Sequence, residues 1–157
     1  MPDYVLQTTD VAIHYGGVKA LDGVDLTLER GQIRGLIGPN GAGKSTVIDA
    51  ITGRRRLTRG TVTLKGEDVS ALGVVERRAR GLSRSFQRTS IFAQMPVRKQ
   101  VELAASTMGM ADPAADAEDV LSELDLDELG EVIAADLGYG QQRRVDLALA
   151  LVGQPTV

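Results

Sequence analysis

Residues 38–46 have the composition and spacing of a loop that binds phosphate groups. Phosphate oxygens need several N–H donors directed at one place, and glycines allow a backbone to curl with its amides facing inward. A lysine supplies positive charge to the β and γ phosphates, and a hydroxyl next to it can ligate Mg²⁺. The sequence meets each need within the pattern G-x-x-x-x-G-K-[ST], formed by Gly38, Pro39, Asn40, Gly41, Ala42, Gly43, Lys44 and Ser45 and followed by Thr46.

The segments on either side of this loop fit the same chemistry. Residues 33–37 form a short apolar run that predicts a strand, and from Lys44 the apolar spacing changes to that of a helix ending near Gly53. A helix that starts at the loop would add its free N-terminal amides and its dipole. The alternative, a chance match in a glycine-rich turn, explains neither flank. A dinucleotide-binding fingerprint fails because its third glycine is missing.

The rest of the chain predicts an α/β body with an inserted helical lobe. The first part has strand patterns separated by turns at Gly16-Gly17 and Asp22-Gly23, which predict an antiparallel sheet. The second part is rich in Ala, Glu, Asp and Leu at helical spacing. The expected strands are residues 4–13, 24–29 and 60–66; the expected helical region is 97–129 with a loop at 108–115, and the last helix is 141–152.

Composition limits the function classes. A chain of 157 residues can bury one core, and its net charge of −3 gives no general attraction to nucleic acid. Its start has neither a basic nor an apolar leader segment, and no run reaches the roughly 18 apolar residues of a membrane span. We expect a cytoplasmic protein that is held at a membrane, if at all, by a partner.

The remaining charged groups predict no second site. Arg54, Arg55 and Arg56 follow a helix end, where cations are favoured. Arg77, Arg78 and Arg80 are expected on a solvated helix face. His14 has no nucleophile or ligand partner by spacing, so neither a catalytic triad nor a metal site is predicted.

Three segments in order resemble ATP-binding-cassette (ABC) ATPases. Residues 38–46 read GPNGAGKST, residues 85–87 read SFQ like a Q-loop, and residues 137–144 read LGYGQQRR like the ABC signature. The resemblance implies a P-loop NTPase fold with an N-terminal antiparallel β subdomain and an inserted α-helical lobe. It assigns residues 1–87 and 138–157 to the nucleotide-binding core and β subdomain, and residues 88–137 to the lobe.

The resemblance also implies roles for residues outside the loop. Tyr15 would stack on adenine, although a half-buried strand tyrosine is the alternative. Gln87 would complete the shell of Mg²⁺ and of the attacking water. The signature residues Gly138, Tyr139, Gly140 and Gln141 would face ATP held by a second subunit. The family's usual serine is Gly138 here, so backbone amides would replace its hydroxyl.

Three stretches are most similar to the LivG-type ATPases of branched-chain amino acid importers: YGQQRR at residues 139–144, YGGVKALDGV at 15–24 and DAITG at 49–53. Urea importers are close in the first half but usually differ at the signature. The implied partners are a second ABC ATPase subunit and membrane-embedded permease subunits, with the protein peripheral on the inner face of the plasma membrane. A soluble ABC ATPase of DNA repair or translation remains an alternative, although the short acidic lobe has no basic stripe.

The family's Walker B strand, an apolar run ending in Asp-Glu, has no counterpart up to Val157. We therefore expect a fragment truncated before Walker B, with the C-terminal part of the core sheet absent. Such a chain should bind ATP and Mg²⁺ far better than it hydrolyses ATP. A nucleotide-binding module without catalysis is the alternative.

Overall fold

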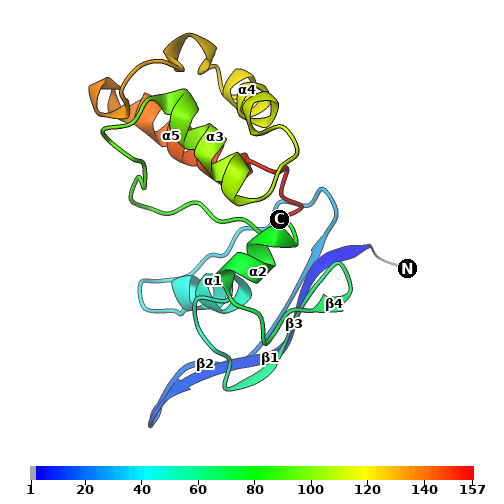
Figure 1. Ribbon diagram of the computed structural model, residues 1–157. Helices are drawn as coiled ribbons and strands as arrows, with labels where there is room; N and C mark the ends of the chain where they lie inside the picture. Colours follow the sequence, from blue (N-terminus) through cyan, green and yellow to red (C-terminus); the bar gives the residue numbers. More distant parts are fainter. Residues whose placement is uncertain (1–2) are drawn as a thin grey trace. The chain divides into compact units, whose positions relative to one another are not determined.

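The computed structural model describes residues 3–157, which form two compact units (Figure 1). The first unit runs to Leu82 and includes Thr156–Val157, and the second unit is Ser83–Pro155. The second unit thus contains the segment after residue 137 as well as the segment before it. The functional division into core and lobe at residues 88 and 137 stays a prediction.

The first unit contains the expected antiparallel sheet, which has the strand order β2-β1-β3-β4. Strands β1 and β2 form a long hairpin that turns at Gly16-Gly17, as predicted, because Gly16 adopts a positive φ of 57°. β3 pairs with the other edge of β1, and the short β4 was not predicted. The strands are β1 (Tyr4–Tyr15), β2 (Val18–Glu29), β3 (Arg59–Leu64) and β4 (Glu67–Asp68).

The turn predicted at Asp22-Gly23 is wrong, because both residues lie inside β2. Val11 pairs with Val24, and Ile13 pairs with Leu21. Between these two pairs, β2 contains one more residue than β1. Gly23 has φ 79°. This is a β-bulge, which a glycine with positive φ can form without ending the strand.

The strand predicted at residues 33–37 is also wrong. Within the described residues this segment pairs with no strand, and its side chains at Ile33 and Ile37 are 99% and 97% exposed. A strand is defined by hydrogen bonds to a neighbour, so apolar and β-branched residues alone do not make one.

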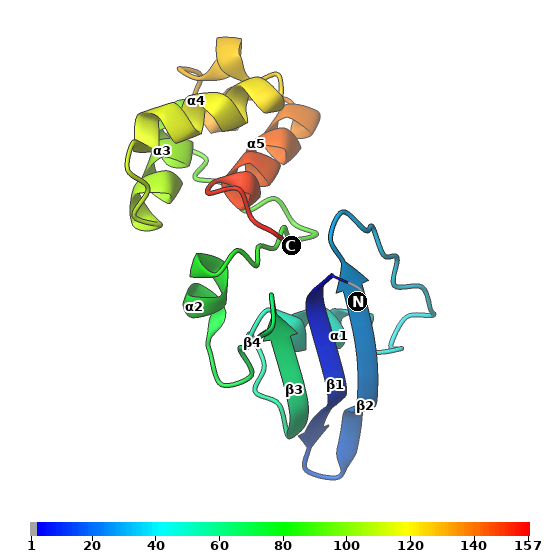
Figure 2. The same ribbon diagram turned by 90° about the vertical axis from the view of Figure 1, so that its right-hand side faces the viewer.

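Helix α1 (Lys44–Ile51) follows the loop and packs on one face of the sheet (Figure 2). Its buried Val47 and Ile51 join the core with Ile13 and Val62 from the sheet. The helix ends as predicted, since Gly53 follows the C-cap Thr52 with φ 75°.

Arg77, expected on a solvated face of the short helix α2 (Val74–Ala79), is instead 1% exposed. Its guanidinium donates to the carbonyl oxygens of Ala50 and Ile51 at 2.8 and 2.6 Å, and also to those of Leu72 and Ser70. Burial lowers the pKa of Arg77. The residue closes the C-terminal end of α1, whose last carbonyls have no partner inside the helix.

The second unit is helical and encloses a core of its own. Helices α3 (Val97–Thr107), α4 (Pro113–Glu123) and α5 (Tyr139–Leu151) pack through Val101, Leu121 and Val145, and two 3₁₀ turns, η1 (Asp127–Leu129) and η2 (Ala134–Asp136), connect α4 to α5.

The loop predicted at residues 108–115 is shorter than expected, because α4 begins at Pro113. The carboxylate of Asp112 accepts the amide of Ala115 at 3.1 Å, which caps the first turn. Proline is favoured at the first position of a helix because its missing N–H would have no partner there.

Candidate nucleotide-binding site

The phosphate loop exposes its backbone. Gly38, Gly41 and Gly43 have φ of 157°, 83° and 85°, a region where side chains are strained. A Cβ atom on Gly43 would lie 3.1 Å from Leu21 and 3.3 Å from the carbonyl oxygen of Ala20, so the loop lies directly against β2. At the tip, Gly41 has no heavy atom within 4 Å of its Cβ position, which leaves open space for a ligand.

The loop passes directly into α1, as the sequence predicted. Gly43 is the N-cap and makes no side-chain cap, so the amides of the first helical turn lack the usual internal acceptor. The hydroxyl-bearing Ser45 is exposed and Thr46 is half-buried. Unpaired amides and the positive end of the helix dipole suit an anion. Residues 38–46 therefore fit a phosphate group, and that the Ser45 hydroxyl ligates Mg²⁺ stays a prediction.

Lys44 lies over this loop. Its ammonium donates to the carbonyl oxygens of Gly38 at 2.6 Å and Pro39 at 2.7 Å. The amide of Ala42 donates to the same Pro39 carbonyl at 3.3 Å, which forms a turn at Asn40 and Gly41. The loop is thus closed on itself around the charge that would meet the phosphates.

Tyr15 belongs to the same unit as the loop. It ends β1 opposite Val18, its side chain is 49% exposed, and the guanidinium of Arg55 lies 5.9 Å from the centre of its ring. Gly43 of the phosphate loop contacts Ala20 and Leu21, which lie two or three residues after Val18 on β2. The distance along the strand from Val18 to this contact is therefore roughly 7–10 Å. The ring is accessible for stacking on a base.

The signature segment forms the start of α5. The helix begins at Tyr139, two residues before the expected start, and Gly138 is its N-cap. The amide of Gly138 donates to the side-chain oxygen of Gln141 at 3.0 Å. Tyr139 is 76% exposed and the Cβ position of Gly140 is open. The predicted signature is therefore an exposed helix start.

Gln87 lies in the second unit with this helix, in a segment without regular secondary structure, and it is exposed. The structure thus groups residues 38–46 with Tyr15, and Gln87 with residues 138–141. That Gln87 shares Mg²⁺ with Ser45, and that residues 138–141 face the nucleotide of a second subunit, stays a prediction.

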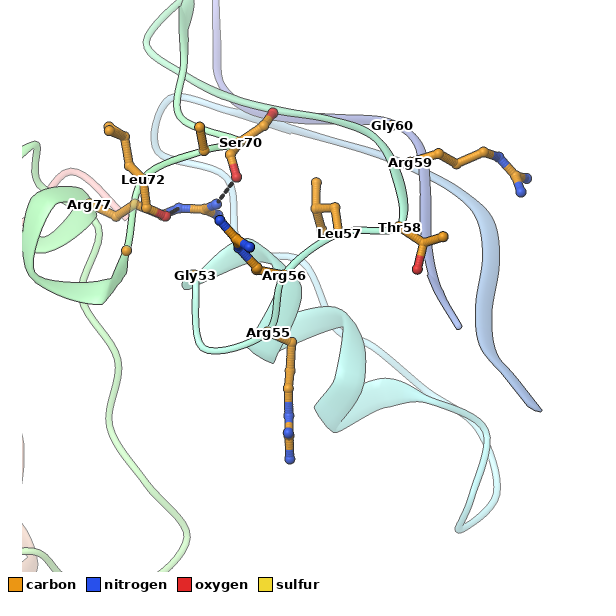
Figure 3. Close-up of a pocket in the computed structure, with 12 residues that line it drawn as sticks. Gly53, Arg55, Arg56, Leu57, Thr58, Arg59, Gly60, Ser70, Leu72 and Arg77 are labelled. Carbon is orange, nitrogen blue, oxygen red and sulfur yellow. Dashed lines mark hydrogen bonds between the residues drawn. The ribbon is translucent and has the colours of Figure 1, made fainter. Parts of the chain in front are cut away.

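An arginine-lined hollow of about 490 Å³ in the first unit offers a different kind of surface (Figure 3). Arg55 and Arg59 line its rim but point away from it in Figure 3. Arg59 pairs with the carboxylates of Asp10 and Asp22 at 2.8 and 3.1 Å. The guanidinium of the buried Arg77 donates its hydrogen bonds to backbone carbonyl oxygens. Arg59 and Arg77 are thus engaged within the protein, and Arg56 also lines the hollow.

Sequence reasoning missed three polar side chains that organise the second unit. Asp146 on α5 and Gln100 on α3 are 5% and 0% exposed, and Arg143 pairs with Asp146 at 2.6 Å. The available signal was a charged residue at 146 between the apolar positions Val145 and Leu149. A carboxylate at the edge of a predicted apolar face needs a partner.

Comparison with known proteins agrees with the geometry. A family model described as ABC transporter matches residues 21–157. The methionine import ATP-binding protein MetN of Rhizobium johnstonii is 33% identical over 157 residues, which cover 98% of this chain and 43% of that protein. The high-affinity branched-chain amino acid transport ATP-binding protein BraF of Pseudomonas aeruginosa is 29% identical over 170 residues, which cover 98% and 67%. The chain thus spans less than half the length of the MetN relative.

Among solved structures, the ADP conformation of MJ1267, an ATP-binding cassette of an ABC transporter, superposes with a TM-score of 0.83 at 28% identity. The match covers 97% of this chain and 66% of that one. The fold is that of a P-loop ABC ATPase, as the sequence predicted. With its phosphate loop at the start of α1 and a family match that covers most of its length, the chain belongs to the ABC transporter family.

Proposed function

We propose that this chain is the ATP-binding part of an ATPase subunit of an ABC importer. The observation that carries the proposal is the exposed phosphate loop, in which Gly43 ends the loop, α1 begins at Lys44, and the Lys44 ammonium lies over the loop carbonyls. This arrangement concentrates N–H donors and one positive charge at a single accessible place.

Each residue has a definite task in this proposal. The amides of residues 38–46 bind the phosphates, Lys44 neutralises their charge, and the Ser45 hydroxyl ligates Mg²⁺. Tyr15 holds the adenine by stacking. Bound Mg²⁺ supplies charge neutralisation at the phosphate that is transferred to water. Gln87 orients groups around the metal, and residues 138–141 serve the nucleotide of a second subunit.

Hydrolysis needs one more element. The family couples ATP hydrolysis to transport, and no apolar run in the 157 residues ends in the Asp-Glu pair that would supply a base. These 157 residues can therefore hold ATP but offer no such base for its hydrolysis. We expect them to bind the nucleotide with little turnover.

The partners of the subunit follow from the same proposed nucleotide site. ATP bound by one copy would meet the signature of another, so the working unit is a dimer of ATPase subunits on permease subunits. No helix among residues 3–157 combines the length and apolar character needed to cross a bilayer. We propose that the permease holds the subunit at the cytoplasmic face of the membrane.

The transported solute is an amino acid in this proposal. BraF is a branched-chain amino acid transport protein and MetN a methionine import protein, and both match nearly the whole chain. The YGQQRR motif at residues 139–144 favours branched-chain amino acids or related small amides, while the higher identity to MetN favours methionine. Uptake of labelled leucine, methionine and urea by vesicles that contain the assembled transporter separates these possibilities.

Calorimetric titration of the purified chain tests the nucleotide proposal directly. Because the loop recognises phosphates, MgATP should bind at least about tenfold more tightly than AMP, a difference of roughly 1.4 kcal/mol. Omitting Mg²⁺ should weaken the binding of ATP. Equal affinity for AMP and MgATP would contradict a phosphate-directed site.

A further inference from the structure

The segment that carries Gln87 is held at both of its ends by α5. A guanidinium N–H of Arg143 donates to the carbonyl oxygen of Phe86, one residue before Gln87. The amide of Ser90 donates to the Asp146 carboxylate at 3.0 Å. The other carboxylate oxygen of Asp146 accepts from Arg143 at 2.6 Å. Two charged residues one helical turn apart thus fix the segment on either side of Gln87.

The burial of these groups makes the attachment specific. The Asp146 side chain is 4% exposed and that of Arg143 is 33% exposed. A buried carboxylate is costly unless hydrogen bonds and an opposite charge compensate it, and here the Ser90 amide and Arg143 do so. The side chain of Gln87 remains exposed. The backbone is therefore anchored while the functional amide stays accessible.

A third side chain continues the attachment downstream. Gln100 of α3 is fully buried, and its side chain accepts the amide of Phe92 at 3.0 Å and donates to the carbonyl oxygen of Met95 at 3.4 Å. Between Leu82 and Pro96 the chain has no helix or strand. Side chains from two helices hold this segment, and backbone amides of Ala134 and Ala135 add hydrogen bonds to Met95 and Ala93 near its end.

Helix α5 also begins with the signature residues 138–141, and Arg143 and Asp146 occupy its following turns. We propose that Arg143 and Asp146 are positioning residues that fix Gln87 relative to the start of α5. The two segments of the second unit that face nucleotide are then presented as one rigid body. The placement itself is independent of ATP, whereas its value for catalysis rests on the proposed function of Gln87.

A spin-label distance measurement tests the placement without nucleotide. The chain contains no cysteine, so Gln87→Cys with Tyr139→Cys gives two unique labelling sites, both exposed. We expect a narrow distance distribution in this background. Asp146→Ala should broaden it at least twofold, because the Ser90 amide loses its acceptor and Arg143 its partner. Asp146→Asn, which keeps an oxygen for Ser90, should restore most of the narrow distribution.

Two further variants keep the test decisive. Glu102→Ala is the matched control, because Glu102 forms an i,i+3 pair with Lys99 at 3.4 Å on α3. It should leave the distribution unchanged. If Asp146→Ala fails to fold, Arg143→Met replaces it, since Arg143 is partly exposed and Met preserves most of its stem. A distribution in Arg143→Met and Asp146→Ala as narrow as in Glu102→Ala would overturn the proposal.

The effect of this positioning on catalysis is measured in the assembled transporter. Asp146→Ala should lower kcat about tenfold with little change in KM, and in a Gln87→Ala background it should add no further loss. Additive losses would show that Asp146 acts independently of Gln87 and would overturn the positioning role. Loss of ATP binding through Lys44 is measured separately, so failure of the nucleotide site is not confused with failure of the attachment.

Discussion

The ammonium of Lys44 donates to the carbonyl oxygen of Gly38, six residues earlier, across the mouth of the phosphate loop at 2.6 Å. One side chain therefore both closes the loop and supplies its charge. Lys44→Ala should weaken the binding of a fluorescent ATP analogue by at least about tenfold, because a charge-assisted contact to phosphate and the loop closure are both lost. Lys99→Ala on α3 is the control and should bind like the parent chain. If folded Lys44→Ala bound the analogue as tightly as folded Lys99→Ala, the assignment of Lys44 to the phosphates would be contradicted.

Tyr15 should contribute through its ring rather than its hydroxyl. Tyr15→Ala should reduce ATP affinity by about 1–2 kcal/mol, the usual value of stacking on a base. Tyr15→Phe retains the ring and should bind within about twofold of the parent, less than 0.5 kcal/mol. Equilibrium titration with ATP measures both. A large loss in the Phe variant would show that the oxygen makes the contact.

Arg77 should stabilise the fold although it is a buried charged residue. Arg77→Met keeps much of the volume but leaves the Ile51 carbonyl oxygen without this donor and that of Ala50 with only the Gly53 amide at 3.3 Å, which should cost about 3 kcal/mol. Arg80→Ala removes a partly exposed arginine that pairs with Glu67 at 2.8 Å, and it should cost less than about 1 kcal/mol. Urea unfolding followed by circular dichroism compares the two. Similar midpoints would refute the capping role of Arg77.

Asp22 should titrate at unusually low pH. The Lys19 ammonium at 2.9 Å, helped by Arg59, lowers the pKa of Asp22 to about 2. A carboxyl group with a depressed pKa contributes its stability fully above the ordinary value of about 3.9 and loses it as pH falls towards the folded value. Lys19→Ala should move the pKa upwards in a carbon-detected NMR titration. An unshifted pKa in the parent chain would rule out this cluster.

The local pattern of the loop and α1 made the first half of the site predictable. Glycines, Lys44 and the change to helical spacing all act over a few residues, and Gly53 marks the helix end for the same local reason. By contrast, residues 33–37 needed a neighbouring strand, and the bulge at Gly23 depended on pairing with β1. Neither partner could be identified from the segment itself.

Polar residues were the least predictable, because their environment is set by distant parts of the chain. Arg77 carries the same charge as its partly exposed neighbour Arg80, yet of the two it is Arg77 that reaches the end of α1. Asp146 contacts Ser90, 56 positions away, and sequence spacing gives no indication of such a contact. The assignment of Gln87 to the Mg²⁺ shell, and of residues 138–141 to the nucleotide of a second subunit, stays a prediction for the same reason.

The hydrogen bond from the Gly138 amide to Gln141 also determines which end of the Gln141 side chain is left over. A backbone N–H can be satisfied only by the amide oxygen, so the carboxamide cannot turn over without losing this cap. Its NH₂ group then takes no part in this cap and offers only donors. The start of α5 is in this way polarised for an anion before any ligand arrives, and Gln141→Glu, which replaces those donors by acceptors, would invert that preference while it keeps the cap.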